Sequence, residues 1–113
     1  SVRVALESID SNVILIMGGL PKDSNFSEIL KFSQSIKSII AYGSASNQIY
    51  DSLSIQCNVL KIEEFDEAVN SSIKLAEKGD LVLMSPGCAS YDQFKNFEER
   101  GDRFKNIVER YYS

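Results

Sequence analysis

Two loops hold the residues whose types and spacing could do chemistry. In the first, Gly18–Lys22 (GGLPK), paired glycines let backbone amides approach a ligand closely, and Lys22 supplies a compact positive charge. In the second, Ser85–Asp92 (SPGCASYD), Ser90 or Asp92 could begin a short helix. The free N–H groups at such a helix start favour a carboxylate or a phosphate. The two loops together therefore suit a small anionic ligand.

Each of these features also has a plainer interpretation. Lys22 could be a solvated lysine in a flexible turn, and Ser90 could cap only its own helix. Cys88 is expected to pack or to line a site, because the sequence has no histidine that could activate its thiol. The first loop matches neither GxxxxGK[ST] nor GxGxxG, so the chain is not expected to hold a nucleotide by itself.

The composition excludes several classes of function. The 113 residues contain no histidine, which removes Ser-His and Cys-His nucleophiles and the usual zinc sites. The net charge is −4 and the basic residues are scattered, so neither a nucleic acid nor a membrane surface is an expected partner. No apolar run approaches the ~20 residues that span a bilayer. We expect a cytosolic protein whose two cysteines are free thiols.

Strands and helices must alternate along the chain to position these loops. Residues 13–17 are apolar on both faces, as in a parallel strand that helices cover on either side. Further strands are predicted over 38–42, 58–62 and 81–84, without hairpin turn signals between them. The pattern predicts an α/β, Rossmann-like three-layer domain with a mainly parallel sheet of about four strands and helices on both faces.

Helices are predicted before, between and after these strands. Residues 2–9 carry one apolar stripe, a short helix follows over about 26–32, and another is predicted over about 64–77. Another helix, with Ser44 as its possible N-cap, carries Ala45, Ile49 and Leu53 inward. The charged run 98–103 is interpreted as a solvated face. The stripe of the last helix consists of Phe104, Ile107, Val108, Tyr111 and Tyr112.

The two loops follow the first and the fourth predicted strand. In an open parallel sheet, ligands bind beyond the carboxyl ends of the strands, where the strand order reverses. If the order is 3-2-1-4, this reversal lies between the first and the fourth strand. We therefore expect Lys22 and Ser90 to lie on the same edge of the sheet, within reach of one small ligand.

The segment Ser85–Gly101 (SPGCASYDQFKNFEERG) closely resembles the C-terminal motif of those Mur ligases that add D-glutamate to UDP-N-acetylmuramoyl-L-alanine. The Gly18–Lys22 loop ahead of Phe26 also resembles this family. The resemblance implies that residues 1–113 are a single C-terminal, amino-acid-binding domain. It places the UDP-binding and ATP-binding domains, with the sites for ATP and magnesium, in parts of the protein outside this chain. The isolated domain is then expected to bind neither cofactor and to be inactive.

The resemblance also implies roles for individual residues. By position in the motif, it assigns Lys22, Ser90, Tyr91 and Phe97 to the D-glutamate site. It makes Gly18, Gly19 and Cys88 residues that line this site, and it places no catalytic residue and no metal ligand in the domain. Tyr91 stands where leucine is common in the family, so the shape of the pocket could differ if its side chain makes the contact.

The main alternative is a stand-alone flavodoxin-like or receiver-like binding module without ligase activity. A receiver should carry paired acidic residues at the end of its first strand and an aspartate after the third. Here the first strand is followed by Gly18 and Gly19, and the third by Glu63. The sequence therefore disfavours a receiver and leaves a domain of a peptidoglycan-synthesising ligase as the leading interpretation.

Overall fold

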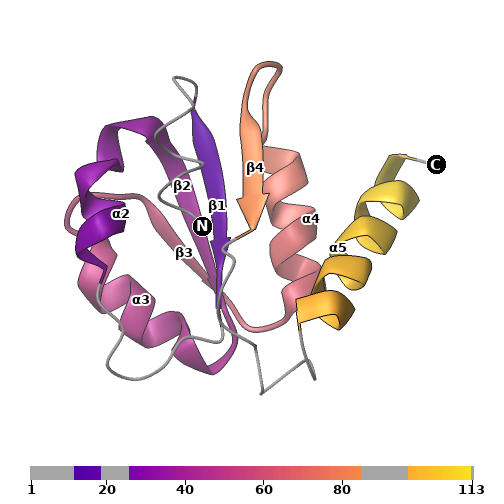
Figure 1. The fold of residues 1–113 in the computed structure, drawn as a ribbon, viewed down its shortest axis with the longest axis horizontal. Helices are drawn as coiled ribbons and strands as arrows, with labels where there is room; N and C mark the ends of the chain where they lie inside the picture. The colour runs from indigo at the N-terminus through magenta and orange to yellow at the C-terminus, as the bar shows by residue number, and fades with distance from the viewer. Residues whose placement is uncertain (1–11, 19–25, 85–96, 113) are drawn as a thin grey trace.

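The computed structural model describes residues 12–18, 26–84 and 97–112. They form three layers, with one sheet between two layers of helices (Figure 1). The sheet has four parallel strands, in the order β3-β2-β1-β4. The strands are β1 (Val13–Met17), β2 (Ile36–Tyr42), β3 (Val59–Ile62) and β4 (Leu81–Met84). The predicted fold class and the strand order on which the predicted site depended are both confirmed.

The helices divide between the two faces of the sheet. Helices α2 (Ser27–Lys31) and α3 (Ser46–Leu53) lie on one side, and α4 (Phe65–Leu75) and α5 (Phe97–Tyr112) lie on the other (Figure 1). Short 3-10 turns, η1 (Ser33–Ser35) and η2 (Gly43–Ala45), precede β2 and α3. No helix of the described residues is long and apolar enough to pass through a membrane. The helix predicted over 2–9 lies outside the described residues.

Strand β1 is the centre of the core, as its composition predicts. Its five residues are all at most 1% exposed. Because successive side chains of a strand point to opposite faces, Val13, Leu15 and Met17 join the cluster under α2 and α3. Ile14 and Ile16 join the cluster under α4 and α5. A strand flanked by helices on both faces needs this unbroken apolar run.

An irregularity at Lys37 sets the start of β2. Val13 pairs with Ile36, but Ile14 pairs with Ser38, so β2 has one extra residue there. This explains why Ile36 and Ile39, at an odd spacing, face the same core cluster. It also explains why the strand predicted from Ser38 begins two residues earlier, at Ile36.

The prediction that Ser44 caps the next helix is wrong. Gly43 adopts φ +74°, and the chain then makes the 3-10 turn η2 before α3 begins at Ser46. Ala45 is the N-cap residue of α3, which has no side-chain cap hydrogen bond. The left-handed glycine delays the helix, so Ser44 lies inside the preceding turn instead of at the helix start.

The last helix buries less of its stripe than its spacing predicts. Ile107 is 5% exposed, and Phe104 and Val108 pack against the same core cluster. Tyr111 and Tyr112, predicted on this stripe, are 44% and 72% exposed. In Figure 1, the C-terminal turns of α5 diverge from α4, so these turns have less of the core to pack against.

Candidate functional site

The two loops that the sequence singles out leave the sheet side by side. Strands β1 and β4 pair in parallel, with Ile16 opposite Met84, and no strand of the described residues lies between them. Residues 19–25 follow the carboxyl end of β1, and residues 85–96 follow that of β4. The described structure therefore brings both loop starts to the point where the strand order reverses.

Most of the predicted site residues lie within these loops and outside the described residues. They are Gly19, Lys22, Cys88, Ser90 and Tyr91. Phe97 is the first residue of α5, directly after the second loop. Gly18 is described and buried at the end of β1. The assignment of these residues to a ligand therefore stays a prediction, while the positions of their flanking elements are known.

Gly18 has a packing role that the sequence did not indicate. A Cβ atom at this position would lie 2.5 Å from Cζ and 2.6 and 2.7 Å from the two Cε atoms of Tyr42. No side chain fits at these distances, because carbon atoms in contact are about 3.5–4.0 Å apart. From the sequence, this glycine is expected to let a ligand approach the backbone closely. The structure gives another reason, which is close approach to an aromatic ring.

Tyr42 in turn contacts the start of α4. Its ring and that of Phe65 are 5.0 Å apart between centroids and meet edge to face at 73°. Tyr42 is 0% exposed and Phe65 is 1% exposed, so neither ring has room to move aside. Such aromatic pairs are geometrically specific. The end of β1 and the first residue of α4 are therefore held at a defined distance through Tyr42.

The next residue, Asp66, joins α4 to α5. Arg103 Nε donates to Asp66 Oδ1 at 2.9 Å, and a terminal guanidinium nitrogen of Arg103 donates to Oδ2. These two hydrogen bonds lower the pKa of the Asp66 carboxyl and raise that of Arg103. Arg103 is exposed, as the interpretation of 98–103 as a solvated face predicts, but it also pairs with Asp66 across 37 residues of sequence.

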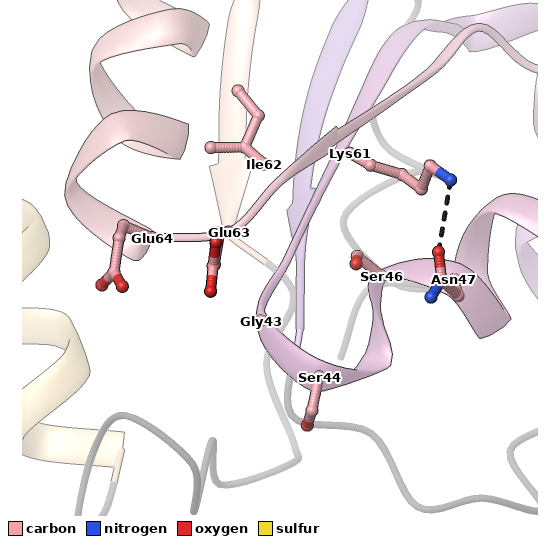
Figure 2. Close-up of a pocket in the computed structure, with 8 residues that line it drawn as sticks. All are labelled: Gly43, Ser44, Ser46, Asn47, Lys61, Ile62, Glu63 and Glu64. Atoms are coloured by element: carbon pink, nitrogen blue, oxygen red, sulfur yellow. Dashed lines mark hydrogen bonds between the residues drawn. The ribbon is translucent and has the colours of Figure 1, made fainter.

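A second recess, absent from the sequence-based predictions, lies at the carboxyl ends of β2 and β3 (Figure 2). Its volume is about 610 Å³. Lys61 Nζ donates to Asn47 Oδ1 at 3.2 Å and lies 4.7 Å from the centre of the Tyr50 ring. The recess is lined by Gly43, Ser44, Ser46, Asn47, Lys61, Ile62, Glu63 and Glu64.

The lining of this recess offers hydroxyl, amide and carboxylate groups to a polar molecule. It comes from four elements, η2, α3, β3 and the turn before α4, so no local motif could reveal it. The one local signal is Gly43, whose positive φ turns the chain away from β2. Its backbone N–H donates to the Glu63 carbonyl at 3.1 Å and joins the ends of the two strands.

Comparisons with known sequences agree on one group of enzymes. A scan against models of protein families finds no match. The chain is 43% identical over 109 residues to the UDP-N-acetylmuramoylalanine–D-glutamate ligase of Chlamydia felis, which covers 96% of the chain and 26% of that ligase. It is 36% identical over 107 residues to the ligase of the same name from Bacillus subtilis, covering 92% of the chain and 24% of that ligase.

A solved structure agrees with the fold. It is a crystallised domain described as coming from a UDP-N-acetylmuramate:L-alanyl-gamma-D-glutamyl-meso-diaminopimelate ligase of Haemophilus ducreyi. The TM-score is 0.55 at 14% sequence identity, over 96% of this chain and 74% of that domain. The chain spans about a quarter of the length of the curated relatives that it matches. Over nearly all of its length, the chain is therefore a relative of part of the UDP-N-acetylmuramoylalanine–D-glutamate ligases, and it shares its fold with the crystallised ligase domain.

Proposed function

We propose that residues 1–113 are the C-terminal, amino-acid-binding domain of a bacterial ligase that adds D-glutamate to UDP-N-acetylmuramoyl-L-alanine in cytoplasmic peptidoglycan synthesis. One observation carries this proposal. The two loops with ligase-like motifs begin at adjacent strands, β1 and β4, where the strand order reverses. The sequence identity of 35–43% to ligases of this name favours a ligase domain over the alternative, a flavodoxin-like or receiver-like binding module.

The proposed task of the domain is to bind and orient D-glutamate. This amino acid has two carboxylates and must present a neutral amine to the activated substrate. Lys22 and the helix start that the sequence predicts near Ser90 would be suitable partners for the carboxylates, because charge-assisted hydrogen bonds are stronger than neutral ones. Tyr91 and Phe97 would complete the pocket, and Gly18, Gly19 and Cys88 would line it. This assignment rests on the family motif and on the positions of the flanking elements.

The proposed reaction has two steps. The γ-phosphoryl group of ATP passes to the carboxylate of the nucleotide-linked L-alanine, which gives ADP and an acyl phosphate. The D-glutamate amine then attacks the acyl carbon, and the tetrahedral intermediate expels phosphate while the amine loses its proton. ATP and magnesium would be held by the central domain of the full-length protein. The C-terminal domain, residues 1–113, would contribute positioning of D-glutamate. Positioning is worth up to several kcal/mol when two reactants are held in line.

Replacing Lys22 by alanine in the full-length ligase tests the proposal. The change would leave a carboxylate of D-glutamate without its charged partner, and such losses cost about 2–4 kcal/mol. We expect kcat/KM for D-glutamate to fall about 30- to 1000-fold. Acyl-phosphate formation, trapped in the absence of D-glutamate, should change much less.

Lys78→Ala is a matched control, because Lys78 is an exposed lysine in the turn before β4. It lies at the amino-terminal ends of the strands, opposite the carboxyl ends where the proposed site begins. The substitution should leave kcat/KM for D-glutamate unchanged. If Lys22→Ala abolishes trapping as fully as ligation, Lys22 serves the nucleotide or domain closure. If Lys22→Ala behaves like Lys78→Ala, Lys22 is only a solvated loop residue and the site assignment is wrong.

A further inference from the structure

We infer that Asp66 and Arg103 are positioning residues, which set the start of α5 relative to the end of β1 and so fix the two sides of the amino-acid site against each other. The inference rests on the proposed function, because it gives these two residues a role in D-glutamate binding. Neither lies in the segments Gly18–Lys22 and Ser85–Gly101 that carry the family resemblance, so neither is a proposed ligand contact.

Helix α5 needs such a support because its apolar attachment is narrow. Among the described hydrophobic side chains of α5, Ile107 is buried, and Phe104 and Val108 are only partly buried. A single short seam allows a helix to rotate or slide. Arg103 lies six residues after Phe97, which is about 9 Å along the helix at 1.5 Å per residue. A contact at Arg103 therefore acts close to the point where the second loop ends.

The form of the contact suits positioning. Arg103 Nε and a terminal nitrogen each bind one of the two oxygens of Asp66, which makes the pair bidentate. Two parallel hydrogen bonds fix both the distance and the orientation of the partners. Lysine could supply the charge but not this geometry, because its ammonium acts as a point charge on a flexible stem.

Asp66 is itself tied to the first loop by successive contacts. Gly18, where that loop begins, lies under the Tyr42 ring, with no room for a Cβ atom. Tyr42 packs edge to face on Phe65, and Phe65 is the neighbour of Asp66 in the first turn of α4. The contacts thus run from the end of β1, through Tyr42 and α4, to α5. They join the two chain segments that border the proposed site without using the loops themselves.

The test uses the full-length ligase with Asp66→Asn, Arg103→Lys and the double variant. The KM for D-glutamate should rise about 3- to 10-fold, the range expected when a supporting contact outside a site is removed. The KM values for ATP and for the nucleotide substrate, and the yield of trapped acyl phosphate, should stay as in the unmodified enzyme. Because the pair acts as a unit, the double variant should be no worse than the worse single variant.

A second ion pair gives the matched control. Lys37 Nζ binds Asp80 Oδ2 at 2.8 Å at the amino-terminal ends of the strands. This pair is more buried than that of Asp66 and Arg103. Asp80→Asn should lower the melting temperature at least as much as Asp66→Asn, yet leave the KM for D-glutamate unchanged. A merely structural role for Asp66 would make the two variants alike, and that result would overturn the inference.

The outcomes also separate this inference from the proposed function. If the unmodified ligase does not use D-glutamate, the proposed function fails and the inference falls with it. If the ligase uses D-glutamate, but Asp66→Asn and Arg103→Lys change only the melting temperature, the proposed function stands and the inference alone is wrong. A selective rise in KM for D-glutamate, absent from Asp80→Asn, supports both.

Discussion

Gly18 illustrates how one residue can satisfy two demands at the border of a site. The glycine pair after β1 suggested close approach of a ligand to the backbone. In the structure, the missing side chain of Gly18 makes room for the Tyr42 ring. The ring cannot swing away, since it is fully buried and packed on Phe65. A requirement of the core is thus sufficient to explain this glycine, whatever the ligand.

We expect Gly18→Ala to destabilise the protein. The new Cβ atom would meet ring carbons of Tyr42 at 2.5–2.7 Å, so the ring or the strand end must shift. Overpacking of this kind costs about 1–3 kcal/mol. Urea unfolding of the 113-residue chain measures the change in the free energy of unfolding.

Gly101→Ala is the control for this prediction. Gly101 lies within α5, and a Cβ atom there would have nothing within 4 Å. Alanine should therefore stabilise the helix by about 0.5–1 kcal/mol relative to glycine. Equal stabilities for Gly18→Ala and the unmodified chain would mean that the ring moves freely, contrary to its burial.

At the scale of the elements, Lys37 joins several elements at the amino-terminal ends of the strands. The extra residue in β2 is Lys37, whose Nζ donates to Asp80 Oδ2 at 2.8 Å and to the Leu75 carbonyl at 3.3 Å. Asp80 Oδ2 also accepts the backbone N–H of Glu77 at 2.9 Å. The start of β2, the end of α4 and the turn into β4 are joined in this way. The extra residue of β2 is thus the one whose side chain binds the turn before β4.

This arrangement predicts how stability depends on acid. The hydrogen bond from Lys37 lowers the pKa of the Asp80 carboxyl, and that from Arg103 lowers the pKa of Asp66. A lowered folded-state pKa contributes stability that is complete above the unfolded value, about 3.9, and is lost as pH falls through the folded value. The free energy of unfolding should therefore fall below about pH 4. Urea unfolding at a series of pH values measures this dependence.

Asp80→Asn separates this contribution from that of other carboxyl groups. Its amide does not titrate, so the variant should be less stable at neutral pH and lose less on acidification than the unmodified chain. Lys37 acts at the other end of the pH range, since its raised pKa contributes stability that disappears only as pH rises past about 10.4. If the free energy of unfolding of Asp80→Asn fell as steeply below pH 4 as that of the unmodified chain, this would argue against the hydrogen bond to Lys37.

At the scale of the whole molecule, the fold bears on what the isolated chain can do. Its sheet is covered on both faces, and each face has its own apolar cluster. We expect the 113-residue chain to unfold cooperatively in urea but to form no amide bond from ATP, D-glutamate and UDP-N-acetylmuramoyl-L-alanine. The proposed reaction needs the groups of another domain to activate the carboxyl. Ligation by the purified chain would refute the proposed division of labour.

The sequence by itself determined the architecture and the point where the strand order reverses. The apolar run of β1, the alternation of strands with helices and the two unusual loops were sufficient to predict a parallel three-layer fold and its reversal point. These signals are local, because the periodicity of a segment reports how many of its faces are buried. The same locality led to the errors at Ser44 and Tyr112, where a helix began late or left the core.

Only the tertiary structure decided which residues meet. This holds for three features that combine residues from separate elements: Gly18 under Tyr42, Asp66 with Arg103, and the recess at the carboxyl ends of β2 and β3. A single sequence carries no signal for such pairs, since the neighbours of an arginine along the chain do not show whether it binds a carboxylate or only water. The partners are selected by how helices settle on the sheet and by which side chains then come within hydrogen-bonding distance. That selection is made by packing, which depends on the whole folded chain.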